Sequence, residues 1–145
     1  MKYFAFFSYI LCKGMDLQDI FIKPEKISCE HWQLGNTIFN EVQENGVVLI
    51  FCSDERGSGG SAEVKDFSRL RKEFYALSSF DFEVPICDLG ELISGKTQAD
   101  TRYVLEEILT FCYNKNAVPV VIGGSVDLSY ALFSALNFHQ KGINY

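Results

Sequence analysis

The chain has 145 residues, of which 48% are hydrophobic and 22% are charged, and its formal net charge at pH 7 is -6. This length and composition are typical of one globular domain and exclude an intrinsically disordered chain. Lysine and arginine form no cluster along the sequence, so we expect no nucleic-acid partner.

Residues 1–14, MKYFAFFSYILCKG, superficially resemble a secretion signal because one lysine precedes an apolar, aromatic-rich run. The run has no small-residue cleavage site and is too short to span a bilayer, so we expect neither secretion nor a membrane partner. Met15 opens a stretch that is more typical of a cytoplasmic start, and we hypothesise that it is the true initiator. N-terminal sequencing of the native protein that found Lys2 or Tyr3 would contradict this hypothesis.

The cysteines are odd in number and form no C-x-x-C pair, which favours a reducing compartment and core packing over disulfides. We therefore expect a cytoplasmic protein, with a disulfide or thiol-redox role as the alternative. The five cysteines are Cys12, Cys29, Cys52, Cys87 and Cys112.

Residues 1–45 show no clean periodicity and are interpreted as an irregular or helical N-terminal extension, with a short helix expected from Leu34 to Val42. Residues 46–145 are interpreted as one partial α/β domain. It opens with residues 47–52, VVLIFC, a continuous β-branched run that predicts a strand buried on both faces.

Helices and strands alternate after this first strand. A helix is predicted over residues 64–79, a strand over 84–90, a helix over 99–116, a strand over 118–122 and a helix from about residue 128. This alternation predicts right-handed βαβ units and a parallel sheet. Residues 141–145, KGINY, look like the opening of a further strand.

The loop at residues 54–60, DERGSGG, follows the first predicted strand, where open α/β sheets place their ligands. Its glycines lack the spacing of a dinucleotide-binding loop, and no Lys-Ser or Lys-Thr follows as in a Walker loop. A solvated connection is the first interpretation. The alternative is a loop that binds a small molecule or anion, with Arg56 and Gly57 as its candidate residues.

The loop IGGSVDLSY follows the third predicted strand, and its glycines, Gly123 and Gly124, permit a tight turn and close approach of the backbone. Ser125 is expected to be the N-cap of the third helix, with Asp127 in its first turn. The loop is not a nucleophile elbow, because Val126 and Asp127 follow the serine and no histidine is nearby.

Three other polar residues are candidates on position alone. His31 and His139 are far apart in the sequence and match no metal-binding spacing, so we interpret both as incidental. Asp88 ends the second predicted strand, where it either caps a turn or faces a site at the carboxyl edge of the sheet.

Four stretches carry a resemblance to a known family: residues 47–57 (VVLIFCSDERG), Leu70-Arg71, residues 88–90 (DLG) and residues 119–136 (PVVIGGSVDLSYALFSAL). Together they resemble the N-terminal half of the ureohydrolase superfamily, which includes arginase, agmatinase and formimidoylglutamase. The last stretch is the most specific. It is similar to the family's strand–Gly-Gly–x–His turn, whose histidine binds a dinuclear manganese site. Here Ser125 takes the x position and Val126 takes the histidine position.

The resemblance implies an α/β fold, a three-layer α/β/α sandwich around a mostly parallel sheet, represented here by its N-terminal half. Val126 cannot ligate a metal, and Asp127 is a poor substitute because one helical step rotates a side chain by about 100°. The family's other ligands, in Asp-x-His-x-Asp and Asp-x-Asp motifs, would fall beyond Tyr145. We therefore expect no manganese cofactor in this chain.

Three functional hypotheses follow. The first is a ureohydrolase-like protein without a competent metal site, acting as a non-catalytic binding or structural module. The second is the N-terminal part of a manganese-dependent hydrolase of linear amidines. The third is a small-molecule binder that uses the loop at residues 54–60. The family's trimers and hexamers also imply self-association.

Overall fold

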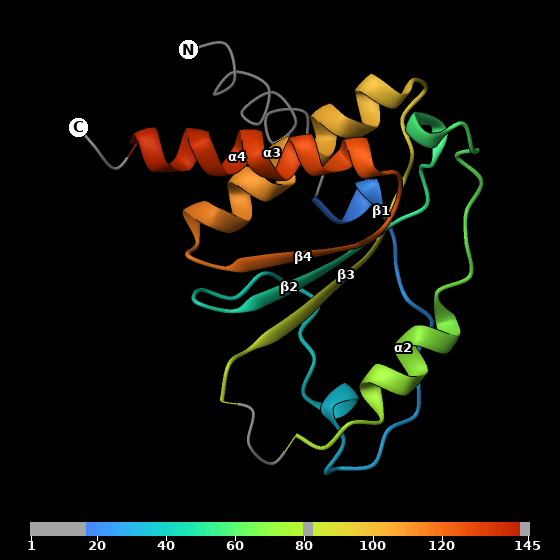
Figure 1. Ribbon diagram of the computed structural model, residues 1–145. Helices are drawn as coiled ribbons and strands as arrows, with labels where there is room; N and C mark the ends of the chain where they lie inside the picture. The colour runs from blue at the N-terminus through green and yellow to red at the C-terminus, as the bar shows by residue number, and fades with distance from the viewer. Residues whose placement is uncertain (1–16, 80–82, 143–145) are drawn as a thin grey trace.

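The computed structural model describes residues 17–79 and 83–142. The described strands are β1 (Phe21–Ile22), β2 (Val47–Cys52), β3 (Ile86–Leu92) and β4 (Val118–Gly123). The described α-helices are α2 (Ser68–Tyr75), α3 (Gln98–Asn114) and α4 (Ser129–Gly142). Figure 1 shows α3 and α4 covering one face of the sheet, while α2 lies against the other. Within the described ranges, no helix has both the length and the apolarity needed to cross a bilayer.

The sheet has the strand order β1-β3-β2-β4, and β2 pairs in parallel with both β3 and β4. β1 pairs antiparallel with β3 at the other side of the sheet. The apolar run of β2 explains its central place, because a strand covered on both faces needs apolar side chains on both sides. The expected α/β class with a mostly parallel sheet is confirmed, while a complete three-layer sandwich stays a prediction.

Each face of the sheet has its own apolar core. The core beneath α3 and α4 contains Val48, Ile50, Leu105, Leu109, Ala131 and Ala135 among its buried residues. The core beneath α2 is smaller and is built around Leu34, Leu49, Phe51 and Ile86. The short α2 therefore covers only part of its face, and Val118 and Val120 of β4 remain 59% and 39% exposed there.

The described cysteines are all free thiols, as expected for core packing. Cys52, Cys87 and Cys112 are buried, and burial raises the pKa of Cys87 and of Cys112 to about 12. A thiol with so high a pKa is a poor nucleophile at neutral pH. Cys12 lies outside the described residues, as do residues 1–14 and the proposed initiator Met15.

The helix expected from Leu34 to Val42 is wrong. Only a 3-10 turn forms, η2 (Leu34–Asn36), and the chain then extends along β3. The Phe39 N–H donates to Ile86 O at 2.8 Å, and the Asp88 N–H donates to Phe39 O at 3.2 Å. These bonds to a neighbouring strand replace the bonds of a local helix. The N-terminal region thus packs on the sheet.

Three element boundaries differ from the prediction for similar reasons. The helix expected over residues 64–79 is shorter, because the Lys65 N–H donates to the Ser53 hydroxyl at 2.8 Å and the preceding loop is extended. The strand expected over residues 84–90 runs on to Leu92, because β1 pairs with Glu91 and Leu92. Lys141 and Gly142, expected to open a further strand, end α4 instead.

Candidate functional site

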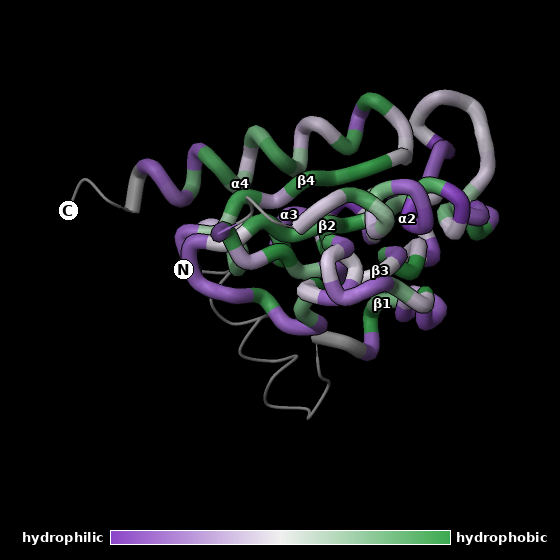
Figure 2. The backbone as a smooth tube through the Cα atoms, turned by 90° about the horizontal axis from the view of Figure 1, so that it is seen from below, coloured by the Kyte–Doolittle hydropathy of each residue, from purple (hydrophilic) through white to green (hydrophobic). Residues whose placement is uncertain are grey.

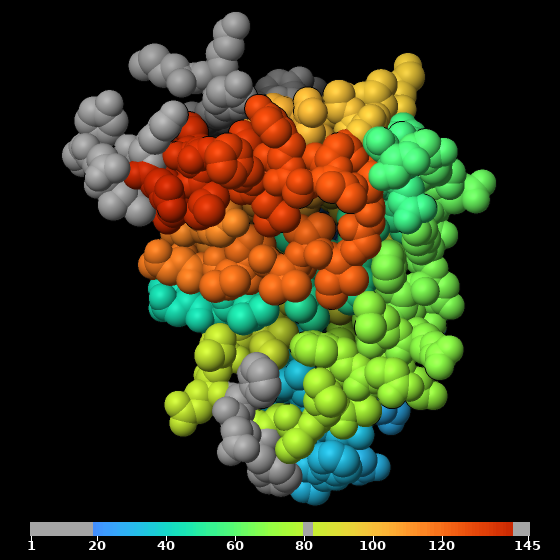
Figure 3. Space-filling view, viewed as in Figure 1, coloured from blue at the N-terminus to red at the C-terminus, as the bar shows by residue number. Residues whose placement is uncertain are grey.

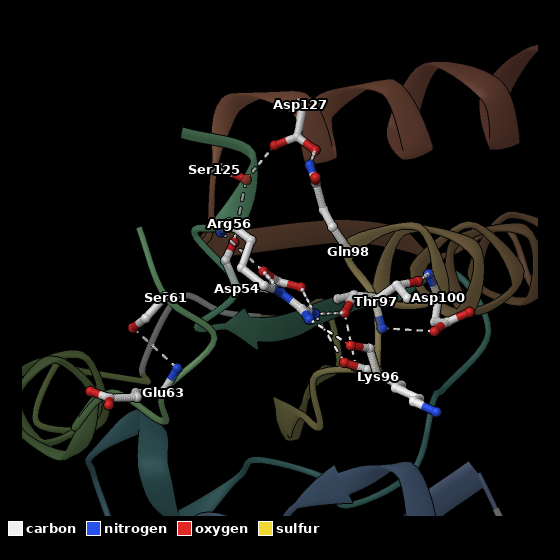
Figure 4. A network of polar contacts seen from close by, with 12 residues as sticks. Asp54, Arg56, Ser61, Glu63, Lys96, Thr97, Gln98, Asp100, Ser125 and Asp127 are labelled. Carbon is white, nitrogen blue, oxygen red and sulfur yellow. Dashed lines mark hydrogen bonds and ion pairs between the residues drawn. The ribbon is translucent and has the colours of Figure 1, made fainter. Parts of the chain in front are cut away.

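The carboxyl ends of β2, β3 and β4 meet at one edge of the sheet, and the loops that follow them carry the candidate residues. The loop after β2 holds Arg56 and Gly57, and the loop after β4 holds residues 123–127. Open α/β sheets bind ligands at this edge. Figure 4 shows that side chains from these loops and from the start of α3 form one polar network.

Arg56 joins the loop after β2 to the connection between β3 and α3. Its Nε and Nη2 donate to the two carboxylate oxygens of Asp54 at 3.0 and 2.7 Å. Its Nη1 donates to Lys96 O at 2.9 Å, and Nη2 also donates to Gly95 O at 2.9 Å and to the Thr101 hydroxyl at 3.3 Å. The guanidinium is therefore held by protein groups on several sides, with its side chain 27% exposed.

Asp54 is fully buried beneath this arginine. The hydrogen bonds from Arg56 hold the pKa of the Asp54 carboxyl at about 2, against the opposing effect of burial. Asp54 is therefore ionised throughout the physiological range, and it acts as an acceptor. A group with so low a pKa is a poor general base at neutral pH.

Asp127 joins the loop after β4 to α3. Gln98 Nε2 donates to one of its carboxylate oxygens, and the Ser125 hydroxyl donates to the other. Gly57 lies against the same carboxylate, and a Cβ added at Gly57 would overlap both Asp127 and Gln98. Gly57 is thus required for close packing of the two loops.

Gly123 and Gly124 form the tight turn that was expected, with φ angles of 88° and 75°. This left-handed backbone favours glycine. The turn delivers the Ser125 N–H to Asp54 O at 3.0 Å, which links the ends of β4 and β2.

The expected capping role of Ser125 is wrong in one respect. Ser125 takes the N-cap position of a 3-10 turn, η4 (Val126–Leu128), which precedes α4. Its hydroxyl makes no capping bond and instead contacts Asp127 and, at 3.4 Å, Asp54 O. The serine therefore links side chains and loops and does not satisfy a helix terminus.

Val126 occupies the position where the resembling family has a metal-binding histidine. Its side chain is 83% exposed and has no lone pair to donate to a metal. Asp127, the adjacent carboxylate, is held by Gln98 and Ser125. Among residues 17–79 and 83–142, no three or more His, Cys, Asp or Glu side chains are grouped so that they could hold a metal ion.

Asp88 does not reach this network. It is buried in β3, where Arg71 Nε donates to it at 2.8 Å and the Tyr75 hydroxyl donates to it at 2.7 Å. The Gly90 N–H donates to its other oxygen at 2.8 Å. Arg71 also lies over the Phe51 ring, at 3.8 Å from its centre. The sequence left a turn role and a site role open, and the structure places Asp88 in a buried ion pair between β3 and α2.

The two histidines lie apart, as their sequence positions indicate. His31 is exposed in the N-terminal region, whereas His139 packs against the Tyr113 ring with 5.9 Å between the ring centres. Neither side chain contacts the polar network of Figure 4.

Several residues of the network were not predicted. Gln98 and Thr101 lie in the first turns of α3, and the only local signal there is the T-x-x-D capping box that Thr97 and Asp100 form. Buried Glu91 accepts a hydrogen bond from Ser53 near the end of β3. Glu91 was missed because the predicted strand ended one residue before it.

No family model, curated protein or solved structure matches this chain. The resemblance to ureohydrolases therefore depends on the sequence stretches alone and stays a prediction.

Proposed function

We propose that this chain is a ureohydrolase-like module without metal-dependent catalysis, with the arginase-like half-sandwich that the resemblance implies. In this proposal the loops at the carboxyl ends of the strands have become a structural network. The observation that carries it is the position of Val126, an exposed apolar side chain where the family places a metal ligand.

The carboxylates around Val126 support the same conclusion. Asp54 is bound by both arms of the Arg56 guanidinium, and Asp127 receives hydrogen bonds from Gln98 and Ser125. A metal ion would have to replace these donors and would leave Arg56 unpaired beside the cation. The network stabilises the loops as they are and disfavours a divalent cation among them.

One contact also supports the resemblance itself. Two of the stretches that resemble the family, Leu70-Arg71 and residues 88–90, are far apart in the sequence. Arg71 and Asp88 pair in the core at 2.8 Å. Such a contact gives these stretches a common structural role.

The proposal is tested by titrating the full chain with Mn²⁺ in a calorimeter and by assaying release of urea or formamide from linear amidines. We expect no saturable binding at micromolar Mn²⁺ and no product. The matched variant is Asp127→Asn, which keeps the size of the side chain but removes its charge. Binding by the parent that Asp127→Asn abolishes, or product formation by the parent, would contradict the proposal.

The second hypothesis, the N-terminal part of a longer manganese-dependent hydrolase, makes a different prediction. The intact mass of the protein from its own cells would then exceed the 16.4 kDa of this sequence. The two hypotheses are separated by measuring that mass and repeating the Mn²⁺ titration on the native protein.

A further inference from the structure

Helix α4 has an unusual composition for a helix at the surface. From Ser129 to Gln140 its sequence is SYALFSALNFHQ, which contains no Asp, Glu, Lys or Arg. Its inner side packs in the core through Ala131 and Ala135, which are fully buried. A surface helix ordinarily carries charged residues on its outer side, and a helix without them is ordinarily buried on every side.

The outer side of α4 instead carries a stripe of large apolar residues. Tyr130, Phe133 and Leu136, called here the α4 stripe, are 58%, 64% and 39% exposed. Their spacing of three residues places them on one side of the helix, away from Ala131 and Ala135. Figure 3 shows α4 lying across an outer face of the molecule, with β4 beside it.

The free edge of β4 is a less suitable contact. Val118 N–H donates to Gly46 O, so Val118 and alternate residues after it direct their backbone groups toward β2. Pro119 and Val121 then direct theirs to the free side, and proline has no N–H to donate. A proline at this position protects an edge strand from pairing. Figure 2 shows β4 as an apolar stretch next to α4, so its contribution is packing.

Charge argues for the partner. The chain carries a net charge of -6, so two copies repel each other except where their contact surface is uncharged. The α4 stripe is such a surface, and a basic partner would find no carboxylate on it. Arg102, which lies over the Tyr130 ring at 5.3 Å, and Glu106, which accepts from Ser134, add charges of both signs beside α4. An apolar centre with aromatic residues and a polar rim is typical of a protein interface.

We propose that the α4 stripe binds the same stripe of a second copy, so that two α4 helices pack against each other across a two-fold axis. A two-fold contact brings each position of the stripe near the same position of the partner copy. Phe133 lies at the centre of the stripe and is its main anchor. This proposal does not depend on the ureohydrolase resemblance or on the state of the metal site.

A membrane surface is the other class of partner that an apolar helix face fits. Helices that lie on membranes carry lysine and arginine on their polar side, and Ser129 to Gln140 contains neither. The acidic net charge also disfavours anionic lipid. A second copy is therefore the better match.

The test is the mass of the full chain by sedimentation equilibrium over a range of micromolar concentrations. We expect twice 16.4 kDa for the parent. Phe133→Glu is expected to raise the dissociation constant of the dimer at least about 30-fold, since a central aromatic anchor contributes about 2 kcal/mol or more. Val64→Glu is the matched control, because Val64 is 65% exposed on the loop before α2 and lies outside the stripe.

Charge pairing tests the two-fold geometry. Phe133→Glu and Phe133→Lys are each expected to be monomeric, and an equimolar mixture is expected to regain dimers because the two positions face each other. Circular dichroism checks that each variant is folded, and Tyr130→Arg is the substitute should Phe133→Glu unfold.

Four results would overturn the proposal. They are a monomeric parent, a parent that forms trimers or hexamers, a Phe133→Glu variant that stays dimeric, and a mixture that stays monomeric. Flotation with phosphatidylcholine vesicles that Phe133→Glu abolishes in a monomeric parent would assign the stripe to lipid.

Discussion

At the scale of single residues, the strongest stabilising contact outside the sheet is the buried group of Arg71, Tyr75 and Asp88. The Arg71 and Asp88 side chains are only 8% and 1% exposed. Burying either charge alone would be costly, so each depends on the other and on the Tyr75 hydroxyl. The carboxylate also raises the pKa of Tyr75, which burial already raises, so the phenol stays protonated and donates.

The Tyr75→Phe substitution tests this group with little change in volume. It leaves Asp88 one donor short, and we expect the free energy of unfolding to fall by about 1–3 kcal/mol. Urea denaturation followed by circular dichroism measures the change. Tyr113→Phe is the control, because the Tyr113 ring packs on His139 without a hydrogen bond from its hydroxyl to a described residue. Equal losses in both variants would contradict the role of Tyr75.

Asp54 makes folding depend on acid pH. Its pKa is lowered from 3.8 to about 2 in the folded protein, so the unfolded chain binds a proton more readily. The resulting stabilisation is complete above about pH 4 and is lost as the pH falls toward 2. We expect the melting temperature of the parent to fall more steeply over this interval than that of Asp54→Asn, which has no carboxyl to titrate there. Parallel pH profiles would show that Asp54 is not responsible.

At the scale of elements, the loops after β2 and β4 are connected through close packing at Gly57. The Gly57 backbone lies against the Asp127 carboxylate, and the Ser125 N–H reaches Asp54 O from the same side. Arg56 connects the loop after β2 to the β3–α3 connection. The ends of three parallel strands are thus tied together by a few polar contacts.

Gly57→Ala tests the loop contact. Gly57 does not have a positive φ angle, so alanine can adopt its backbone and the effect is one of space. We expect a loss of about 1–3 kcal/mol in the free energy of unfolding, the usual effect of overpacking. Ser58→Ala, at the next and exposed position, should change it little.

The double variant Gly57→Ala/Asp127→Ala shows whether the clash is with Asp127. It should lose less than the sum of its single variants, because the truncated side chain makes room. Additive losses in thermal or urea denaturation would place the clash elsewhere.

At the scale of the whole molecule, the polar network and the α4 stripe lie on different parts of the same unit. The network sits at the carboxyl edge of the sheet, whereas the stripe lies along the outer side of α4 (Figures 1 and 4). Self-association through α4 therefore leaves the carboxyl-edge loops accessible. Substitutions in one region are expected to act independently of those in the other.

The sequence by itself determined the elements whose patterns are local and long. The continuous run of β2, the apolar run of β4 and the helical spacing of α3 predicted these elements with small boundary errors, and α3 also begins at a capping box. The glycines of residues 123 and 124 predicted the turn after β4. Arg56, Gly57 and Asp127 were recognised as candidates because they follow strands in a βαβ pattern.

Only the tertiary structure decided which side chains meet and where weak elements end. Phe39 bonds to β3 in place of forming a helix, Arg56 reaches Gly95, and Arg71 reaches Asp88. These partners are distant in sequence, and no local periodicity encodes them. The physical reason is that a backbone or charged group satisfies its hydrogen bonds with whichever partner folding brings close, and in a buried place that partner outweighs local preference.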